Sequence, residues 1–238
     1  MIRSIADFTN ELEGEFDGDN FLFRGQPDDS DLLPKLARLS LPDVLETERQ
    51  LLSDFRREAL PYLDRPVSDP WEWLAVAQHH GLPTRLLDWT TNPLVALWFA
   101  VCEEPRKSKL GIVWTFKTSP EQHVEADEEP FNAPSTRIFR PNHITRRIVV
   151  QSGWFTCHKH IFHENRFIPL NRHKACKESI SKLQIDPAFF HRLRWELDRC
   201  GINYGFLFPD LEGLCKKIAW KHCYLDKKQA YKEPLRNR

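Results

Sequence analysis

Apolar residues recur along most of the chain at the spacing of helices, and in fewer segments at the spacing of strands. Helices are predicted at about 2–12, 42–63, 70–80, 94–101, 177–183, 187–200 and 210–222. Strands are predicted for short runs rich in aromatic and β-branched residues, at 21–25, 84–90, 111–116, 146–153 and 154–157. We therefore predict an α+β fold in which helices cover a split, mostly antiparallel sheet.

The 238 residues show no repeat, low-complexity tract or flexible linker, so we expect one domain over 1–238. The longest apolar run, Leu94–Cys102, is far shorter than the roughly 20 residues that span a bilayer. Charged and apolar residues alternate over Ile2–Glu15, which is unlike a signal peptide. These features predict a cytoplasmic protein that does not contact membranes.

The formal net charge is 0, which gives the whole molecule no electrostatic attraction to nucleic acid. The charges are unevenly distributed, with nine acidic residues and one basic residue over Asp7–Asp31, and eight basic and two acidic residues over Lys216–Arg238. We interpret both stretches as solvated surface. Weak binding of RNA or phosphate by the basic C-terminal tail is the alternative.

The six cysteines include no C-x-x-C pair, and the chain is long enough to fold without disulfides. Cys157, His158, His160 and His163 form one contiguous cluster, whereas zinc sites usually join two ligand pairs across a loop. We therefore expect reduced cysteines and no bound metal.

Arg24 ends an apolar strand and precedes Gly25, which permits a close approach of the backbone. Its guanidinium offers a planar fork of donors that suits a phosphate or a carboxylate. A structural ion pair with a nearby acidic side chain is the alternative.

The segment 78–90 places polar side chains in an apolar neighbourhood, where they must be buried in pairs. We expect a rigid, buried loop over 79–88, in which Arg85 and Asp88 either brace each other or serve a site. Asp88 with His79 or His80 would also supply the acid and base of a hydrolase or nuclease.

The predicted strand 146–153 carries Gln151 beside a glycine and two aromatic residues. A glutamine can hold a ligand hydroxyl but is a poor general base. We predict that Arg24, Arg85, Asp88 and Gln151 converge on one cavity, because a shared ligand would gather residues that are distant in sequence.

Six strings together resemble the FRG domain family, which takes its name from a Phe-Arg-Gly motif. They are FRGQ, LLPKLAR, DFRREALPYL, WEWLAVAQHHGLPTRLLDWTTNPLVALWFAV, RRIVVQSGWFTCH and GINYGFLFPDLEGL. The resemblance covers about 19–217 and leaves a basic tail at 218–238. It implies a role in bacterial defence or a toxin-like context.

A more distant resemblance is to ADP-ribosyltransferases of the arginine–serine–glutamate class. Arg24-Gly25, then Thr90 and Thr91 before the helix with Ala96–Ala100, then Gln151, follow the order of that class. The resemblance implies an ADP-ribosyltransferase-like fold and NAD as the cofactor. It implies NAD-binding roles for Arg24, Gly25, Gln26, His79, Arg85, Thr90, Thr91 and Phe155, and catalytic roles for Arg24, Asp88 and Gln151.

In that class Arg24 would hold the diphosphate of NAD, and the Thr90 and Thr91 hydroxyls would support the nicotinamide pocket. Trp89, Trp98 and Phe155 would supply stacking surface for a planar ring. Gln151, however, stands where the class has its catalytic glutamate. Either Asp88 or a glutamate such as Glu125 replaces it, or the domain binds a nucleotide without cleaving it.

Three functional hypotheses therefore remain. The first is an ADP-ribosyltransferase-like, NAD-cleaving toxin or defence domain with a macromolecular acceptor or an antitoxin as partner. The second is a non-catalytic module of the same fold that binds a nucleotide or a partner. The third is the hydrolase or nuclease.

Overall fold

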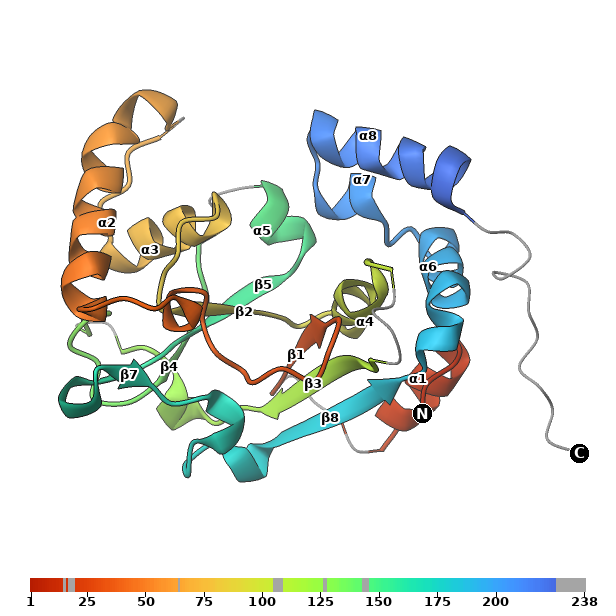
Figure 1. The fold of residues 1–238 in the computed structure, drawn as a ribbon, viewed down its shortest axis with the longest axis horizontal. Helices are drawn as coiled ribbons and strands as arrows, with labels where there is room; N and C mark the ends of the chain where they lie inside the picture. The colour runs from red at the N-terminus through yellow and green to blue at the C-terminus, as the bar shows by residue number, and fades with distance from the viewer. Residues whose placement is uncertain are drawn as a thin grey trace, which may run out of the picture.

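The computed structural model describes residues 1–14, 16, 20–63, 65–104, 109–125, 128–142 and 146–225 (Figure 1). Its strands are β1 (Phe21–Gln26), β2 (Leu86–Thr90), β3 (Gly111–Lys117), β4 (Arg137–Phe139), β5 (Gly153–Cys157), β6 (His160–Ile161), β7 (Arg166–Phe167) and β8 (Ile180–Ile185). Its α-helices are α1 (Ile5–Leu12), α2 (Val44–Glu58), α3 (Pro70–His79), α4 (Pro93–Val101), α5 (Arg146–Val150), α6 (Phe190–Arg199), α7 (Tyr204–Leu207) and α8 (Leu211–Ala219). The mixed α+β prediction is confirmed.

Six strands form one sheet in the order β4-β5-β2-β1-β3-β8, and every neighbouring pair is antiparallel. The centre of this sheet is weakly paired. β1 and β3 are in register over six positions, from Phe21 with Lys117 to Gln26 with Ile112, whereas β1 and β2 are matched only at Phe23 and Thr90. The two halves of the sheet therefore separate beside this pair, which opens space between β1 and β2.

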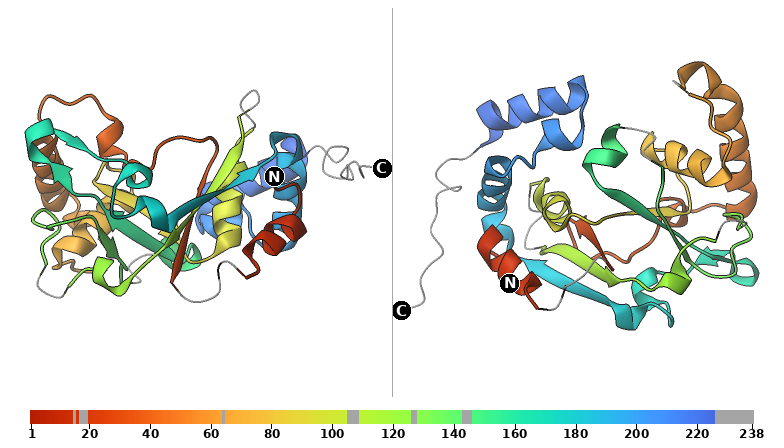
Figure 2. Two further views of the ribbon diagram at one scale, coloured as in Figure 1. Left: turned by 90° about the horizontal axis from the view of Figure 1, so that it is seen from below. Right: turned by 180° about the vertical axis from the view of Figure 1, so that it is seen from behind.

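Two groups of helices cover one face of the sheet (Figures 1 and 2). α1, α4 and α6 pack over β1, β3 and β8, where α4 contributes a nearly continuous buried surface. α2 and α3 pack over β2, β4 and β5 around Trp71, Trp73 and Phe155. The space between the groups is bordered by α5 and α7.

The opposite face of the sheet is covered by loops. Leu22, Leu87 and Trp114 pack there against Leu32 and Leu170 from the connecting segments. This layer also holds buried polar groups that are paired with one another: the Trp89 ring N–H donates to the Thr156 hydroxyl at 3.0 Å, and that hydroxyl lies 3.1 Å from Nε2 of His158.

Two sequence-based element predictions are wrong. Residues 146–153 do not form a strand, because α5 covers Arg146–Val150 and β5 begins at Gly153. Residues 177–183 do not form an α-helix, because only a 3-10 turn covers Lys177–Ser179 and β8 pairs with β3 from Ile180 to Ile185 at the edge of the sheet. In both cases tertiary packing overrides a local preference.

No helix among the described residues is long and apolar enough to cross a membrane. The predicted basic tail lies partly outside these residues, since nothing beyond position 225 is described.

Candidate functional site

A cavity of about 290 Å³ lies between the two helix groups, above the separated strands β1 and β2. β1, α3, β2, α4, α5 and the turn after α5 all contribute to its wall. The lining residues are Phe23, Arg24, Gly25, Gln78, Asp88, Trp89, Thr90, Val95, Ala96, Phe99, Arg147 and Gln151. Three of the four residues that were predicted to converge, Arg24, Asp88 and Gln151, therefore line one cavity, although 127 positions separate the first from the last, and Arg85 does not line it.

Arg24 lies at the centre of this site and reaches across the gap from β1 to β2. Its Nη1 donates to the backbone O of Asp88 at 2.7 Å and lies 3.6 Å from the Asp88 carboxylate. The side chain is only 17% exposed, and its Nε is buried without a hydrogen-bond partner among the described residues. Burial lowers the pKa of Arg24, and Asp88 opposes that effect. A buried cation with an unused donor is suited to an anionic ligand.

Asp88 is held in place by neighbours on both sides. Gln78 Nε2 donates to its Oδ2 at 3.0 Å, and the Thr84 hydroxyl in turn donates to Gln78 Oε1 at 2.8 Å. The Asp88 side chain is nevertheless 58% exposed. The prediction that Asp88 is buried is therefore wrong, and the carboxylate is positioned yet open to a ligand.

Gln151 and Thr90 form the floor of the cavity. Gln151 Nε2 donates to the backbone O of Leu207 at 2.9 Å, and the Thr90 hydroxyl donates to the backbone O of Gln151 at 2.6 Å. The same hydroxyl accepts from Asn92 N at 3.0 Å, just before α4. Both side chains thus connect the strands to α4 and α7, which is a positioning role.

Arg147 supplies a second guanidinium to the cavity wall. It lies over the ring of Phe208, 4.3 Å from the ring centroid. Burial lowers its pKa, while the charges of Asp88 and Asp210 oppose that shift. With Arg24 and Asp88, the formal charge of the lining side chains is positive, which favours an anion.

Arg85 does not belong to this site, and the prediction that it pairs with Asp88 is wrong. Its guanidinium faces Glu48 of α2, with Nε 3.0 Å from each carboxylate oxygen and Nη2 2.5 Å from Oε2. The two side chains are 3% and 2% exposed. Arg85 also lies 4.6 Å from the centroid of the Phe131 ring. It joins α2 to β2 as a buried ion pair.

Other predicted ligand-binding residues also lie away from the cavity. Gln26 is buried and donates from Nε2 to the O of Ser30 at 3.2 Å. Thr91 is exposed, and its N donates to the O of Ser152 at 3.3 Å. Phe155 is buried against Trp71 and Phe139 beneath α3. None of these three side chains lines the cavity.

The two histidines at the end of α3, His79 and His80, do not support the hydrolase hypothesis. His79 and His80 contact each other edge-to-face, and His80 lines a separate hollow beside α2. Burial, with the charges of His80 and Arg147, lowers the pKa of His79 to about 4, although Asp88 and Asp210 oppose the shift. His79 is therefore uncharged at neutral pH and cannot act there as a general acid.

The lowered pKa of His79 predicts a loss of stability in acid. The unfolded chain takes up this proton near pH 6.5, and the folded protein near pH 4. The contribution of neutral His79 to the free energy of unfolding is therefore fully present above pH 6.5 and falls as the pH drops toward 4. Urea unfolding at several pH values should show a smaller acid loss for His79→Gln than for the wild type. An equal loss in both proteins would contradict the assignment.

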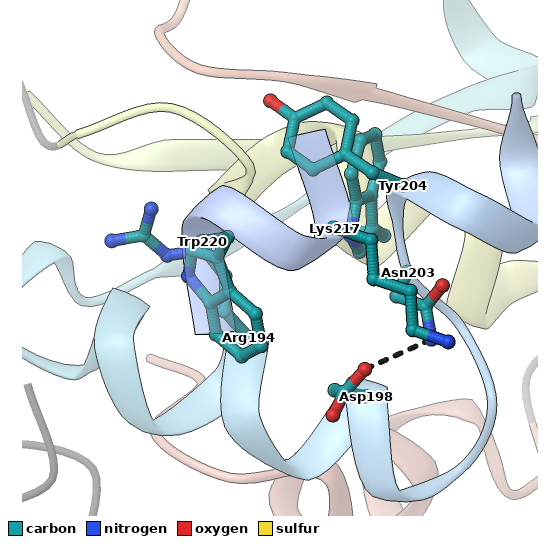
Figure 3. Close-up of a pocket in the computed structure, with 7 residues that line it drawn as sticks. Arg194, Asp198, Asn203, Tyr204, Lys217 and Trp220 are labelled. Carbon is teal, nitrogen blue, oxygen red and sulfur yellow. Dashed lines mark hydrogen bonds between the residues drawn. The ribbon is translucent and has the colours of Figure 1, made fainter. Parts of the chain in front are cut away.

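A much smaller cavity lies between α6, α7 and α8 (Figure 3). Its volume is about 10 Å³, enough for one water molecule, and an Asn203–Asp198 hydrogen bond runs along its edge. Trp98 faces this region and contacts Tyr204 edge-to-face. The prediction that Trp98 stacks on a ligand in the main site is therefore wrong.

Larger hollows of about 560 and 590 Å³ lie beside α2 and beside the acidic segment that contains Glu125. Carboxylates dominate the charged groups that face them, among them Asp54 and Glu58 in the first and Glu128 and Glu129 in the second. Such walls repel phosphate. Compared with these two hollows, the cavity at Arg24 is the better candidate for an anionic ligand, and Glu125 lies outside it.

Comparison with known families agrees with the motif at β1. Residues 19–109 match the FRG domain. This range contains β1, α2, α3, β2 and α4, and so the FRG resemblance inferred from the sequence is confirmed for it. The FRG match does not extend to Arg147 and Gln151, which complete the cavity from outside it.

No curated protein and no solved structure matches the chain. The resemblance to ADP-ribosyltransferases therefore stays a prediction.

Six of the lining residues were not among the predicted site residues: Phe23, Gln78, Val95, Ala96, Phe99 and Arg147. Arg147 precedes Gln151 by four positions, and the backbone N of Gln151 donates to its O at 3.0 Å. A helical interpretation of 146–150 would have placed both residues on one face of a turn. Gln78 could have been found as a nearby partner for the Asp88 carboxylate.

Proposed function

We propose that the cavity binds a phosphate-bearing nucleotide of the NAD type, and that the protein acts as an ADP-ribosyltransferase-like domain. The observation that carries this proposal is the convergence of Arg24, Arg147 and Asp88 on one cavity with two glutamine side chains. Two cations can hold phosphate oxygens, and amide and carboxylate oxygens can accept from ribose hydroxyls.

Arg24 is the principal anion-binding group in this proposal. Its Nη1 is already used by the Asp88 backbone, while its buried Nε has no partner among the described residues. A phosphate oxygen in the cavity would add a charge-assisted hydrogen bond to this guanidinium. Gly25 supports this arrangement from the other side of β1, because its missing side chain lets α4 approach the strand closely.

Cavity size indicates how much of the ligand is enclosed. About 290 Å³ is at the lower end of the roughly 300–1,000 Å³ that is usual for small-molecule sites. One half of a dinucleotide would fill it, with Phe23 and Phe99 as its apolar wall. The other half would extend past Asp88 toward solvent.

Cleavage of NAD is a second candidate function, favoured by the position of Asp88. A positively charged intermediate at the ribose needs a fixed carboxylate beside it, and Gln151 cannot supply one. Asp88 is the carboxylate among the lining residues, and Gln78 and Arg24 hold it toward the cavity. Without that chemistry, the same site would serve a non-catalytic nucleotide-binding module.

The test is to mix purified protein with NAD, follow binding by calorimetry and measure free nicotinamide by chromatography. We expect saturable binding of NAD. If Asp88 acts in cleavage, nicotinamide accumulates with the wild type and not with Asp88→Asn, while Asp88→Asn still binds. The absence of binding for both NAD and ADP-ribose would refute the proposal.

We also propose a toxin or defence role in a bacterial cell, which rests on the resemblance to the FRG domain, with a macromolecular acceptor of ADP-ribose or an antitoxin as partner. The basic residues after position 218 would add weak attraction to a nucleic acid or phosphate-rich partner. Both partner proposals depend on nucleotide binding, so the NAD assay should be done first.

A further inference from the structure

α8 is oriented with its apolar side toward solvent. Leu211, Leu214 and Ile218 are 78%, 45% and 50% exposed, although a surface helix normally buries such a stripe. Its inner side instead carries Gly213, which leaves room for the backbone of Phe208, and the buried Trp220 of the following turn. The outward stripe is therefore not needed to attach α8 to the rest of the protein.

These residues form one continuous face, which we call the outer face of α8: Leu211, Leu214, Cys215 and Ile218. Their spacing of three and four positions places them along one side of the helix. All four are exposed. A contiguous apolar stripe of this kind marks an interaction surface. In Figure 1, α8 lies at the rim of the molecule, where a partner could approach it.

The charges along α8 indicate what that partner is. Asp210 and Glu212 are at the start of the helix, and Lys216, Lys217 and Lys221 are at its end. Lys216 forms an exposed ion pair with Glu212 of the same helix at 2.7 Å, which leaves Lys217 and Lys221 as further positive charges at this end. A second copy of the helix that runs antiparallel would bring each acidic end beside a basic end. An isologous contact needs this self-complementarity, whereas a parallel pair would place like charges together.

We propose that the outer face of α8 is a homodimer interface, in which two copies of α8 pack antiparallel about a two-fold axis. The axis passes between Leu214 and Cys215, so that Leu211 of each chain meets the Ile218 end of the other. The two Cys215 thiols then lie near each other at the centre. Neither the nucleotide cavity nor its ligand is needed for this contact.

The interface is small. α8 has nine residues, about 14 Å of helix, and a single turn from Trp220 to Tyr224 extends it. Such a pair buries less surface than a standard stable interface. We therefore expect a weak dimer that forms as the protein concentration rises.

Sedimentation velocity over a range of protein concentrations tests this directly. The wild type should shift from monomer to dimer, and Leu214→Lys should raise the dissociation constant about tenfold or more. Leu60→Ser is the matched control, because Leu60 is 63% exposed on a different surface, after α2. Its dimerisation should equal that of the wild type. A wild type that stays monomeric at every concentration, or a dimer unchanged by Leu214→Lys, would overturn the proposal.

Cross-linking locates the axis. A short bismaleimide should join two copies of a Cys200→Ser/Cys223→Ser variant through Cys215, and adding Leu214→Lys should prevent it. A Cys215→Ser/Cys223→Ser variant keeps the exposed Cys200 and should give little covalent dimer. Equal cross-linking through Cys200 and Cys215 would show random collision and contradict the antiparallel arrangement.

Discussion

Replacing Glu48 by alanine is expected to destabilise the protein by about 3–5 kcal/mol, the usual cost of leaving a buried charge without its partner. Arg85 is 3% exposed, and three of the hydrogen bonds of its guanidinium go to the Glu48 carboxylate. The Glu48 carboxylate is itself only 2% exposed, so the pair is closed to bulk solvent in the folded protein. Urea unfolding of both proteins measures the change.

The control for this prediction is Glu46→Ala on the same helix. Glu46 is 53% exposed and pairs with Arg49 on the surface, so its loss should cost less than about 1 kcal/mol. Asp88→Ala does not test this pair, because Asp88 is the partner of Arg24 and not of Arg85. A Glu48→Ala variant as stable as the wild type would show that Arg85 finds another partner or that water reaches it.

The second large effect is expected for Gly25→Ala. A Cβ at this position would lie 1.8 Å from the O of Ala96 and 2.6 Å from the N of Ala100. Both are backbone atoms of α4, so no side-chain rotation relieves the clash, and the helix must move away from β1. We expect a loss at or above the upper end of the roughly 1–3 kcal/mol that overpacking costs.

Gly153→Ala is the matched control, because its added Cβ would meet nothing closer than the O of Ile148 at 3.5 Å. It should change stability by well under the loss for Gly25→Ala. Thermal or urea unfolding separates the two variants. If Gly25→Ala unfolds like Gly153→Ala, the close contact between β1 and α4 is not as described.

The elements that could be predicted are those with local signals. α3 begins at Pro70 and ends just before Gly81, and α4 follows the Asn92 cap and Pro93, so their ends are encoded nearby. β1 and β3 are short apolar runs that fit a buried strand in either context. For these elements, sequence pattern and tertiary packing agree.

The misassigned segments depend on distant residues. The β-branched residues of α5 favour a strand, but the segment packs beside α7, and the carbonyl of its Arg147 accepts from the backbone N of Gln151 in a helical turn. β8 contains Ile180 and Leu183 at helical spacing, and only pairing with β3 makes it a strand. Local propensity does not encode the packing of α5 beside α7 or the pairing of β8 with β3.

Only the part of the candidate site that carries a local sequence signal could be predicted. Arg24, Asp88 and Gln151 stand out as polar residues beside glycines and aromatic residues, and they do share a cavity. The partner of Arg85 is Glu48, 37 positions away on a helix whose exposed and buried acidic residues look alike in sequence. A pairing at that distance depends on how α2 packs against β2, which the pattern does not encode.

The most direct test of the nucleotide site is a calorimetric titration of NAD into the wild type and Arg24→Lys, with Arg57→Lys as control. Lysine keeps the charge but lacks the planar pair of donors. The account predicts that Arg24→Lys binds NAD about 10–150-fold more weakly, the equivalent of roughly 1.5–3 kcal/mol for hydrogen bonds to charged groups. Arg57 is 71% exposed on α2, and its variant should bind like the wild type. Unchanged NAD affinity in Arg24→Lys, together with a lowered melting temperature, would contradict the account and make Arg24 a structural partner of Asp88.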